Sequence, residues 1–598
     1  MKRFRHYIKA NSRSESPRHI LCFDTETEPE MLPDGAIRHK LWFGWGVYQR
    51  ANSPGDWRKP QWFRFARPRD FWRQVEGFIA DKTTLYVFCH NTNFDLPVVK
   101  TFRLLRQMGW EMSRAVIDAP PTIIAMRKGL KKLVLLDTLN WWRVPLAELG
   151  KSVGAPKLPM PDREAGPDAW DEYCRADCEV IRRAVTGWID MLAVEDLGGF
   201  ANTLAAQSMR TWRHKFMTSL VLIDTNTEAL DLSRAAYLGG RNEVFRQGVI
   251  KGKVHCVDIN SMYPGVMHKR PFPTKLVGVT RTLTDRTFVK YRHSHATLGK
   301  VLLRTEEPIY PRIIGGRLCF PVGTFWAHLA GPELAYAWDH GHILKLESLA
   351  IYEQGELFTE FVEYFYKKRL RARAAGDELM AFFLKILLNS LYGKFGQRGR
   401  VWEEDGTTES EESRSWIEYD VSTGTIRRCR QLAGLVQVKS EAGESAESMP
   451  AIAAYVTSYA RLELFRLILL AGWENVIYCD TDSLFVTDRG FAHLTTMLDP
   501  DRLGAPKHEW TSRKVHIRGL KDYSVGDKVK VKGVRRNATW LTDAELVQDG
   551  WTGLRGQLRE GDLDNTYTRA IRKRLSREYT KGTIGPDGRV SPLRLIES

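Results

Sequence analysis

The sequence predicts a multidomain protein that combines α/β and α+β architecture, and three observations support this fold class. A chain of 598 residues is too long for one hydrophobic core, so two to four domains are expected. Short apolar runs at 19–24, 41–48 and 85–89 have the pattern of buried strands. The segments 169–195 and 356–398 have helical patterns instead, so both kinds of element occur along one chain.

Composition and charge indicate a folded protein with a polyanionic partner. Hydrophobic residues make up 43% and charged residues 27% of the chain, which is typical of a soluble globular protein. The formal net charge of +17 favours nucleic acid as the partner, and simple solubility is the alternative. The eight cysteines are scattered, and Cys174 and Cys178 lack a second pair to complete a zinc site. With no signal-peptide core and no long apolar run, we expect a cytoplasmic protein without a membrane span.

Changes in composition indicate where the domains divide. The strand-rich N-terminal part is expected to form a domain of about 190 residues. Residues 403–448 contain two polar, acidic stretches around an expected hairpin from Trp416 to Arg428, which indicates an exposed insertion rather than core. The helical segment before it carries a basic cluster, formed by Lys367, Lys368, Arg369, Arg371 and Arg373.

Two carboxylates two positions apart, Asp480 and Asp482, lie between the apolar runs 475–477 and 484–486. This pattern predicts a hairpin with the acids at its tip. Hard divalent cations prefer such oxygen ligands, although a bare D-x-D is more often a solvated turn. Asp258 follows another apolar run and can supply a third carboxylate from a neighbouring strand. Three acids on two strands are suited to a pair of Mg²⁺ ions and to phosphoryl transfer.

The helical segment 385–393 lies between these acids in the sequence. On a helix, Lys385, Asn389 and Tyr392 share one face, which offers a cation, an amide and a phenol. A solvated helix face is the alternative interpretation. The opposite, apolar face is expected to carry Phe383, Ile386, Leu387 and Leu391.

The N-terminal part has its own set of acids. Asp24 and Glu26 follow one strand, and Asp95 comes shortly after another. Tyr173 and Asp177 are four residues apart on an expected helix, so they share a face. Each cluster alone is more often a surface feature. Together, four carboxylates and a tyrosine are sufficient for two-metal hydrolysis, with Tyr173 orienting the attacking water.

These motifs, in this order, resemble those of a known family. The segments 258–264 (DINSMYP), 385–393 (KILLNSLYG) and 478–483 (YCDTDS) resemble the three polymerase motifs of family B DNA polymerases. The N-terminal acids resemble the motifs of proofreading 3′–5′ exonucleases. The segment 237–240 (YLGG) resembles the Y-x-G-G element of the protein-primed subgroup of bacterial viruses and linear plasmids. The resemblance extends from about residue 18 to residue 535.

The resemblance implies a ribonuclease-H-like 3′–5′ exonuclease domain followed by a right-hand polymerase domain with palm, fingers and thumb. It also implies two insertions, of which the second helps to encircle DNA in the subgroup. The acidic stretches depart from that role, and we expect them on the outer side. The expected division is 1–190 exonuclease, 191–265 palm, 266–355 first insertion, 356–398 fingers, 399–450 second insertion, 451–535 palm and 536–598 thumb.

For the polymerase, the resemblance makes Asp258 and Asp482 the chief metal ligands, with Asp480 assisting. Tyr263 is expected under the incoming sugar, where it excludes a ribose 2′-hydroxyl. Lys368, or Lys367, is a further candidate for phosphate contact. The residues expected at the nucleotide are Ser261, Tyr263, Lys368, Lys385, Asn389 and Tyr392, and those expected at the DNA are Tyr237, Gly239, Gly240, Lys521 and Tyr523.

For the exonuclease, the resemblance makes Asp24, Glu26, Asp95 and Asp177 metal ligands. Lys157 is a candidate for the family's catalytic-site lysine. The residues expected to contact single-stranded DNA are Asn91, Phe94, Thr138 and Leu139, and stacking of aromatic rings on bases would make this contact tolerant of sequence.

The implied cofactor is Mg²⁺ (or Mn²⁺), with two ions per active site. The implied partners are template and primer DNA, dNTPs and a terminal protein whose hydroxyl serves as primer, and a monomer is expected. Two alternatives remain open. One is a primer-independent family B polymerase, and the other is a DNA-binding nuclease with an inactive polymerase module.

Overall fold

The computed structural model describes residues 3–597 except 119, 163, 282–284, 400, 411, 423, 441 and 442. Parts of the acidic stretches predicted within 403–448 therefore lie outside the described residues. Among the residues that are described, no helix is both long enough and apolar enough to cross a membrane.

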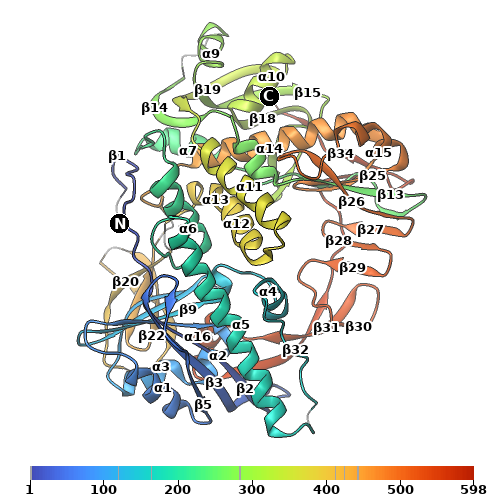
Figure 1. Cartoon of the computed structure of the whole chain (residues 1–598). Helices are drawn as coiled ribbons and strands as arrows, with labels where there is room; N and C mark the ends of the chain where they lie inside the picture. The colour runs from blue at the N-terminus through green and yellow to red at the C-terminus, as the bar shows by residue number, and fades with distance from the viewer. Residues whose placement is uncertain are drawn as a thin grey trace.

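The N-terminal part is built on a large mixed sheet, as the apolar runs predicted. The predicted strands at 19–24, 41–48 and 85–89 are all present, and the strand that carries Asp24 is central. A long helix, α5 (Pro167–Val194), lies along these strands (Figure 1). The strands in spatial order are β3 (Ile37–Ser53), β2 (His19–Met31), β6 (Thr84–Cys89), β9 (Lys131–Asp137), β8 (Thr122–Lys128) and β7 (Glu111–Ile117).

A second, antiparallel sheet carries the other acids. The predicted hairpin is present as two strands joined at Thr481 and Asp482, and Asp258 lies on the strand beside it. Helices α14 (Pro450–Ala471) and α15 (Asp488–Leu494) pack nearby (Figure 1). The strands in order are β11 (Asn242–Val244), β24 (Val476–Asp480), β25 (Ser483–Thr487), β13 (Val254–Ile259) and β26 (Pro506–Ser512).

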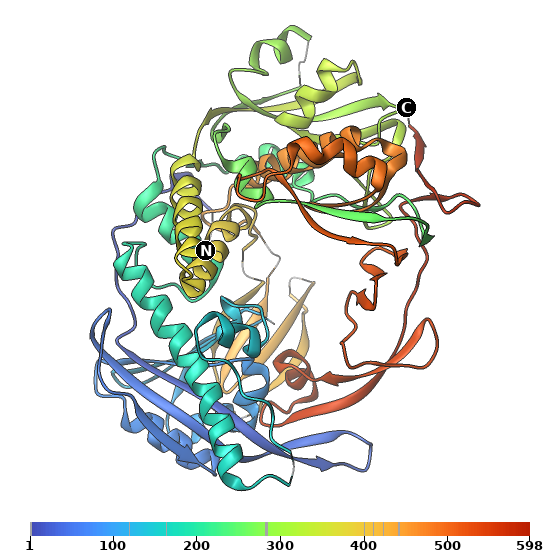
Figure 2. The same ribbon diagram turned by 45° about the vertical axis from the view of Figure 1, so that its right-hand side comes forward.

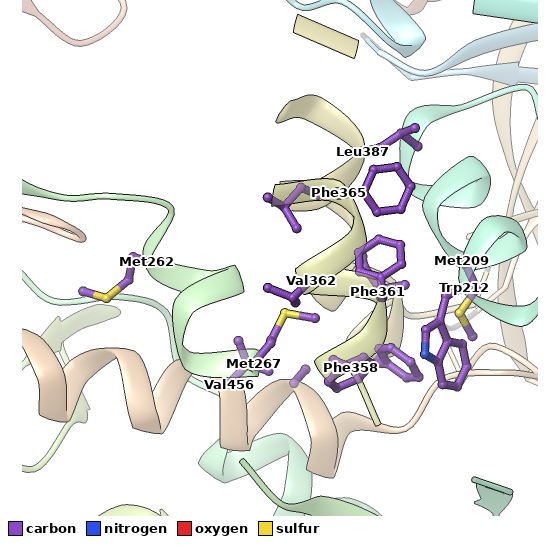
Figure 3. Packing of buried hydrophobic residues seen from close by; sticks show 14 of the residues in the cluster. Met209, Trp212, Met262, Met267, Phe358, Phe361, Val362, Phe365, Leu387 and Val456 are labelled. Atoms are coloured by element: carbon purple, nitrogen blue, oxygen red, sulfur yellow. The ribbon is translucent and has the colours of Figure 1, made fainter. Parts of the chain in front are cut away.

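The helical segment predicted at 356–398 forms three helices that pack on neighbouring helices, including α8 (Met262–Met267), which follows the strand that bears Asp258. Figure 3 shows Phe358, Phe361 and Phe365 on the side of Met209 and Trp212, while Val362 lies near Met267. These apolar contacts fix the helices so that Lys385 of the second one lines the same cleft as Asp258 and Asp482. The helices are α11 (Thr359–Ala374), α12 (Glu378–Ser390) and α13 (Tyr392–Phe395), and they pack with α6 (Leu204–Thr211) and α8.

The region between Pro264 and the helices forms a sheet of its own. Its four long strands pack against α10 (Gly331–Asp339) and α14, with a core of aliphatic and aromatic side chains. The strands in order are β14 (Phe272–Thr280), β19 (Ile343–Gly355), β15 (Ala296–Thr305) and β18 (Val322–Ala330).

The region predicted to be an exposed insertion is partly core. The predicted hairpin is present, with Trp416 opposite Cys429. However, Leu432 and Leu435 are buried against the N-terminal domain, because the apolar run 432–436 meets its core. Arg106 of that domain donates to the carbonyl of Ala433 at 2.9 Å. The strands are β20 (Trp402–Thr407), β21 (Arg414–Asp420), β22 (Thr425–Leu432) and β23 (Leu435–Lys439).

The C-terminal region connects distant parts of the molecule. Strands β31 (Glu545–Trp551) and β32 (Thr566–Arg574) extend the N-terminal sheet, because β32 pairs with β3. The chain then returns, and β35 (Arg594–Ile596) pairs in parallel with β18 (Figure 2). A smaller sheet precedes this region, formed by β12 (Gly248–Ile250), β27 (Val515–Gly519), β28 (Asp522–Val525) and β29 (Lys528–Val531).

Candidate active sites

The catalytic turn, defined here as Asp480–Asp482, brings two of the predicted acids beside the third. Asp258 on β13 is next to it, because its strand partner is Ser483 and the amide of Ile259 donates to the carbonyl of Asp482 at 2.8 Å. Thr481 has φ of 64°, a left-handed conformation that is unusual for a β-branched residue. Its amide donates to the carbonyl of Arg241 at 2.7 Å, which holds the turn in this conformation.

The three carboxylates differ in their surroundings. Burial and the neighbouring Asp258 raise the pKa of Asp482 to about 6. Burial also raises the pKa of Asp258, although Lys507 lies 3.5 Å from its carboxylate. Asp480 instead accepts a hydrogen bond from Asn242 at 3.0 Å and pairs with Lys521 at 3.1 Å. Adjacent buried carboxylates repel one another, and a bound cation relieves this repulsion, so the donor set fits a hard divalent metal.

A cleft of about 1550 Å³ extends from these acids toward the N-terminal domain. Asp258 and Asp482 line it, and Asp480 does not. The predicted nucleotide residues Ser261, Lys385 and Asn389 also line it. Among the cations that line the cleft, Lys507 and Lys385 are close enough to Asp258 to affect its charge, and Arg369 is close to Ser261.

The predicted helix face is only partly correct. Lys385 and Asn389 lie on α12, but this helix ends at Ser390, so Tyr392 belongs to α13. The ring of Tyr392 stacks on that of Tyr263, with centroids 4.3 Å apart. Ile386 was expected in the core and instead lines the cleft, whereas Phe383, Leu387 and Leu391 are buried as expected.

The structure corrects the predicted second phosphate contact. Lys368 forms an ion pair with Glu195 and lies over the ring of Tyr364, so its charge is directed away from the cleft. Lys367 pairs with Glu363 at 2.7 Å. Arg369, one residue further along α11, lines the cleft instead, and its Nη1 lies 3.4 Å from the hydroxyl of Ser261. Successive residues of an α-helix are rotated by about 100° about its axis, so the neighbours Lys368 and Arg369 point in different directions.

The glycine segment 237–240 packs against the catalytic turn. A Cβ on Gly240 would lie 2.8 Å from Cγ2 of Thr481, so the close approach requires glycine. The ring of Tyr237 lies against Gly396, where an added Cβ would meet it at 2.3 Å. No atom would obstruct a Cβ on Gly239.

The two residues of the K-x-Y element are placed differently. Lys521 reaches the acid Asp480, as described above, and its own amide donates to the hydroxyl of Tyr478 at 3.2 Å. Tyr523 is largely buried, with its ring 5.4 Å from Tyr478 and 5.3 Å from Phe485. A DNA contact by the Tyr523 ring therefore stays a prediction that its burial does not favour.

The N-terminal acids converge from three elements. Asp24 and Glu26 lie on β2, Asp95 on α2 (Thr92–Val98) and Asp177 on α5. Burial raises the pKa of Glu26 to about 7 and that of Asp95 to about 8. Burial, together with the charges of Asp95 and Asp177, also raises the pKa of Asp24. This second donor set likewise fits a hard divalent metal.

Two further side chains complete this cluster. Lys157 forms an ion pair with Asp177, and its Nζ lies 4.1 Å from the ring centroid of Tyr173. Cys174, which the sequence did not single out for this site, offers its Sγ within 4.8 Å of ligand atoms of Asp24 and Glu26. Burial raises the pKa of the Cys174 thiol well above its usual value, so the thiol remains protonated and donates to the carbonyl of Asp24.

The predicted single-strand residues border this cluster. Asn91 is exposed with φ of 79°, and Thr138 is buried while Leu139 is half-buried. The buried carboxylate of Asp137 accepts from the amides of Asn91 and Leu139 at 3.1 and 2.9 Å, so it joins the two segments. Phe94 meets Trp551 of the C-terminal region edge to face, with centroids 5.1 Å apart. Neither Asp137 nor Trp551 stood out from the sequence.

The raised pKa values predict how the metal-free protein responds to pH. With EDTA present, we expect the free energy of unfolding to fall as the pH rises from about 5 to about 8. The folded protein keeps protons on Glu26 and Asp95 that unfolded carboxyls release near pH 4. Thermal unfolding across this pH range measures how steeply the free energy of unfolding falls with pH. Added Mg²⁺ should make this fall less steep.

Asp95→Asn is the matched control for this pH dependence. It keeps a polar partner for the hydroxyl of Thr25, which donates to Asp95 at 2.7 Å, but removes one titrating carboxyl. We expect a smaller slope in this variant. An unchanged slope would show that Asp95 is not protonated in the folded protein.

Comparison with solved structures identifies the class of this fold. Phi29 DNA polymerase complexed with primer-template DNA and incoming nucleotide substrates matches with a TM-score of 0.65 at 15% identity, over 94% of this chain and 100% of that chain. The binary complex with primer-template DNA matches with a TM-score of 0.62 at 16% identity, over 87% and 93%. The chain thus has the fold of a multidomain DNA polymerase.

Sequence comparison gives the family. The family described as DNA polymerase type B, organellar and viral, matches residues 167–486, more than half of the chain. The chain therefore belongs to the organellar and viral type B DNA polymerases, which confirms the predicted family. Its relatives include the DNA-directed DNA polymerase of Enterobacteria phage PRD1, 26% identical over 87% of this chain and 86% of the relative. The DNA polymerase of Bacillus phage M2 is 24% identical over 73% and 77%.

Proposed function

We propose that this DNA-directed DNA polymerase also proofreads with a 3′–5′ exonuclease and starts synthesis on a terminal protein. One observation carries the assignment of the two activities: the chain gathers two separate sets of buried and half-buried carboxylates, one at each of two different sheets. One set borders a cleft that holds Arg369, Lys385 and Lys507. The other lies on a mixed sheet of the kind expected for a ribonuclease-H-like domain.

At the polymerase site, Asp258 and Asp482 would hold Mg²⁺ (or Mn²⁺), with Asp480 assisting, and the metal would supply Lewis-acid stabilisation of phosphoryl oxygens. Arg369, Lys385 and Lys507, which are among the cations of the cleft, neutralise the triphosphate and position it. The stacked rings of Tyr263 and Tyr392 form a rigid wall, which suits the predicted exclusion of a ribose 2′-hydroxyl. Catalysis then consists mainly of positioning and charge stabilisation.

At the exonuclease site, Asp24, Glu26, Asp95 and Asp177 would hold the same kind of ion. Lys157 stabilises the charge on Asp177, and it lies over the ring of Tyr173. In this arrangement the Tyr173 hydroxyl is held where it can orient a water. Asn91, Phe94, Thr138 and Leu139 border the cluster and are the proposed grip on a single strand.

The second insertion is proposed to border the DNA path. Arg430 and Lys439 line the cleft, as does Trp402, over whose ring the guanidinium of Arg430 lies at 4.2 Å. Asp405 of the first acidic stretch pairs instead with Arg427 at 2.6 Å. This separation of charges supports the expectation that the acids face outward.

Arg369→Ala and Lys368→Ala form a matched pair of variants. We expect Arg369→Ala to raise the KM for dNTPs by about 10-fold, because a charge-assisted phosphate contact contributes roughly 1.5–3 kcal/mol. Lys368→Ala should change this KM by less than about twofold, because Lys368 is engaged by Glu195. Steady-state extension of a labelled primer measures the KM for dNTPs of both variants. A larger rise in Lys368→Ala than in Arg369→Ala would refute the assignment of Arg369.

The terminal protein is tested by priming reactions. The purified chain is incubated with linear template, dNTPs and Mg²⁺, with and without a candidate terminal protein. Formation of a covalent protein–nucleotide product and of full-length DNA only when that protein is present supports the proposal. Full-length product without the protein or any oligonucleotide would instead identify a primer-independent polymerase.

A further inference from the structure

Arg461 of α14 and Glu333 of α10 form a buried ion pair behind the catalytic turn. Their side chains are 2% and 1% exposed. Nε and Nη2 of Arg461 donate to the two carboxylate oxygens of Glu333 at 2.7 and 2.8 Å. Burial of such a pair brings little net stability, so its presence calls for another reason.

The third nitrogen of Arg461 supplies that reason. Nη1 donates to the carbonyl of Leu238 at 2.7 Å and to that of Gly239 at 3.0 Å. All three nitrogens of the guanidinium are therefore engaged, and two of the acceptors belong to the glycine segment. Neither Arg461 nor Glu333 lines the cleft described above.

The glycine segment and the two residues that follow it, Arg241 and Asn242, in turn hold the catalytic turn. Gly240 lies against Thr481, and the carbonyl of Arg241 accepts the Thr481 amide at 2.7 Å. Asn242 donates to the carboxylate of Asp480 at 3.0 Å. Backbone strain such as that of Thr481 persists only where the surrounding structure over-determines the conformation. The contacts of residues 238–242 meet this condition.

We propose that Arg461 and Glu333 are positioning residues for polymerisation. They fix the segment 238–242 against the catalytic turn and thereby keep Asp480 and Asp482 beside Asp258. Because Glu333 belongs to the first insertion, the same contacts connect that insertion to the polymerase acids. This inference rests on the proposed metal-dependent function of those acids.

The geometry requires arginine at this position. A guanidinium presents donors in a fixed planar fork, which can bind a carboxylate on one side and carbonyls on the other. A lysine has one nitrogen, so Arg461→Lys keeps the charge but loses the contacts to Glu333 or those to the glycine segment. Arg466→Lys is the matched control on the same helix, because Arg466 is exposed and pairs only with Glu463, at 3.1 Å, among the described contacts.

The test compares both variants with the wild type below their thermal midpoints. For Arg461→Lys we expect the rate of primer extension at saturating dNTP to fall by about 10-fold and the Mg²⁺ concentration for half-maximal rate to rise, as for other residues that orient metal ligands. The KM for dNTPs and the degradation of single strands should stay within about twofold of wild type. Arg466→Lys should match wild type throughout.

Two results would overturn the inference. One is a wild-type extension rate and Mg²⁺ dependence in folded Arg461→Lys. The other is an equal loss of extension and exonuclease activity, which would indicate a general structural role. A wild type that cannot extend primers refutes the proposed function itself, which separates the two failures.

If Arg461→Lys does not fold, Glu333→Gln replaces it. This variant keeps the contacts of Arg461 to the two carbonyls but weakens its anchor. We expect faster amide hydrogen exchange in residues 238–242 and a loss of extension rate smaller than 10-fold. Unchanged exchange together with an unchanged rate would overturn the inference.

Discussion

We expect Asp482→Ala to abolish primer extension and to leave single-strand degradation within about twofold of wild type. Of the three predicted polymerase acids, Asp258 and Asp482 line the cleft, and the other acid of the catalytic turn cannot replace Asp482 there, since Asp480 is engaged by Asn242 and Lys521. The loss should be at least about 10²–10³-fold, as for removal of one transition-state stabilising group.

Two comparisons make this prediction specific. Asp480→Asn should reduce extension less than Asp482→Ala, because its carboxylate lies outside the cleft. Thermal unfolding in EDTA should show no loss of stability in Asp482→Ala, because the substitution removes a carboxylate whose pKa is raised by burial and by Asp258. If extension survives Asp482→Ala, the assignment of the polymerase site is wrong.

Asp24→Ala gives the converse result. We expect degradation of single strands to fall by at least about 10²-fold, while extension of a matched primer stays near the wild-type rate. Asp24 lies on β2, in the N-terminal sheet, and the polymerase acids lie on a separate sheet. The variant should also extend mismatched primer ends that the wild type first removes, which a gel assay with labelled mismatched primers detects.

Asp190→Ala is the matched control for the exonuclease. Asp190 is another carboxylate of α5, but it accepts a hydrogen bond from the indole of Trp57 at 2.8 Å and is remote in sequence from the acidic cluster. It should keep both activities. Equal loss of degradation in Asp190→Ala and Asp24→Ala would mean that the effect arises from a general disturbance of the N-terminal domain and not from the carboxylate cluster.

Much of both candidate sites could be predicted because their acids follow strong local patterns. Asp480 and Asp258 come at or near the ends of their strands, whereas Asp24 ends an apolar run but lies within β2, which continues to Met31. An apolar run predicts a buried strand, so the polar residue that ends the run marks where burial stops. The order of the motifs along the chain then identified the family, which the family match confirmed.

Other features depend on partners that the local pattern does not reveal. Lys368 and Arg369 are adjacent basic residues that face different sides of α11, and Glu195, more than 170 positions away, holds Lys368 away from the cleft. In the predicted second insertion, acidic neighbours obscured the apolar run 432–436, which the N-terminal core buries. Likewise, the pairing of β32 with β3 joins segments more than 500 positions apart.

The sequence by itself determined the family, most of the strands and helices that carry the motifs, and the acids that the fold brings together at the two candidate sites, because these follow from short-range periodicity and residue chemistry. The tertiary structure alone decided which cations face the cleft, how Thr481 is held in its strained conformation and how Arg461 reaches the glycine segment. Those outcomes depend on burial and on hydrogen bonds between residues distant in sequence, such as the 2.7 Å contact from Arg461 to Leu238. Local patterns in the sequence do not reveal such contacts, because they form only when the folded chain brings distant residues together.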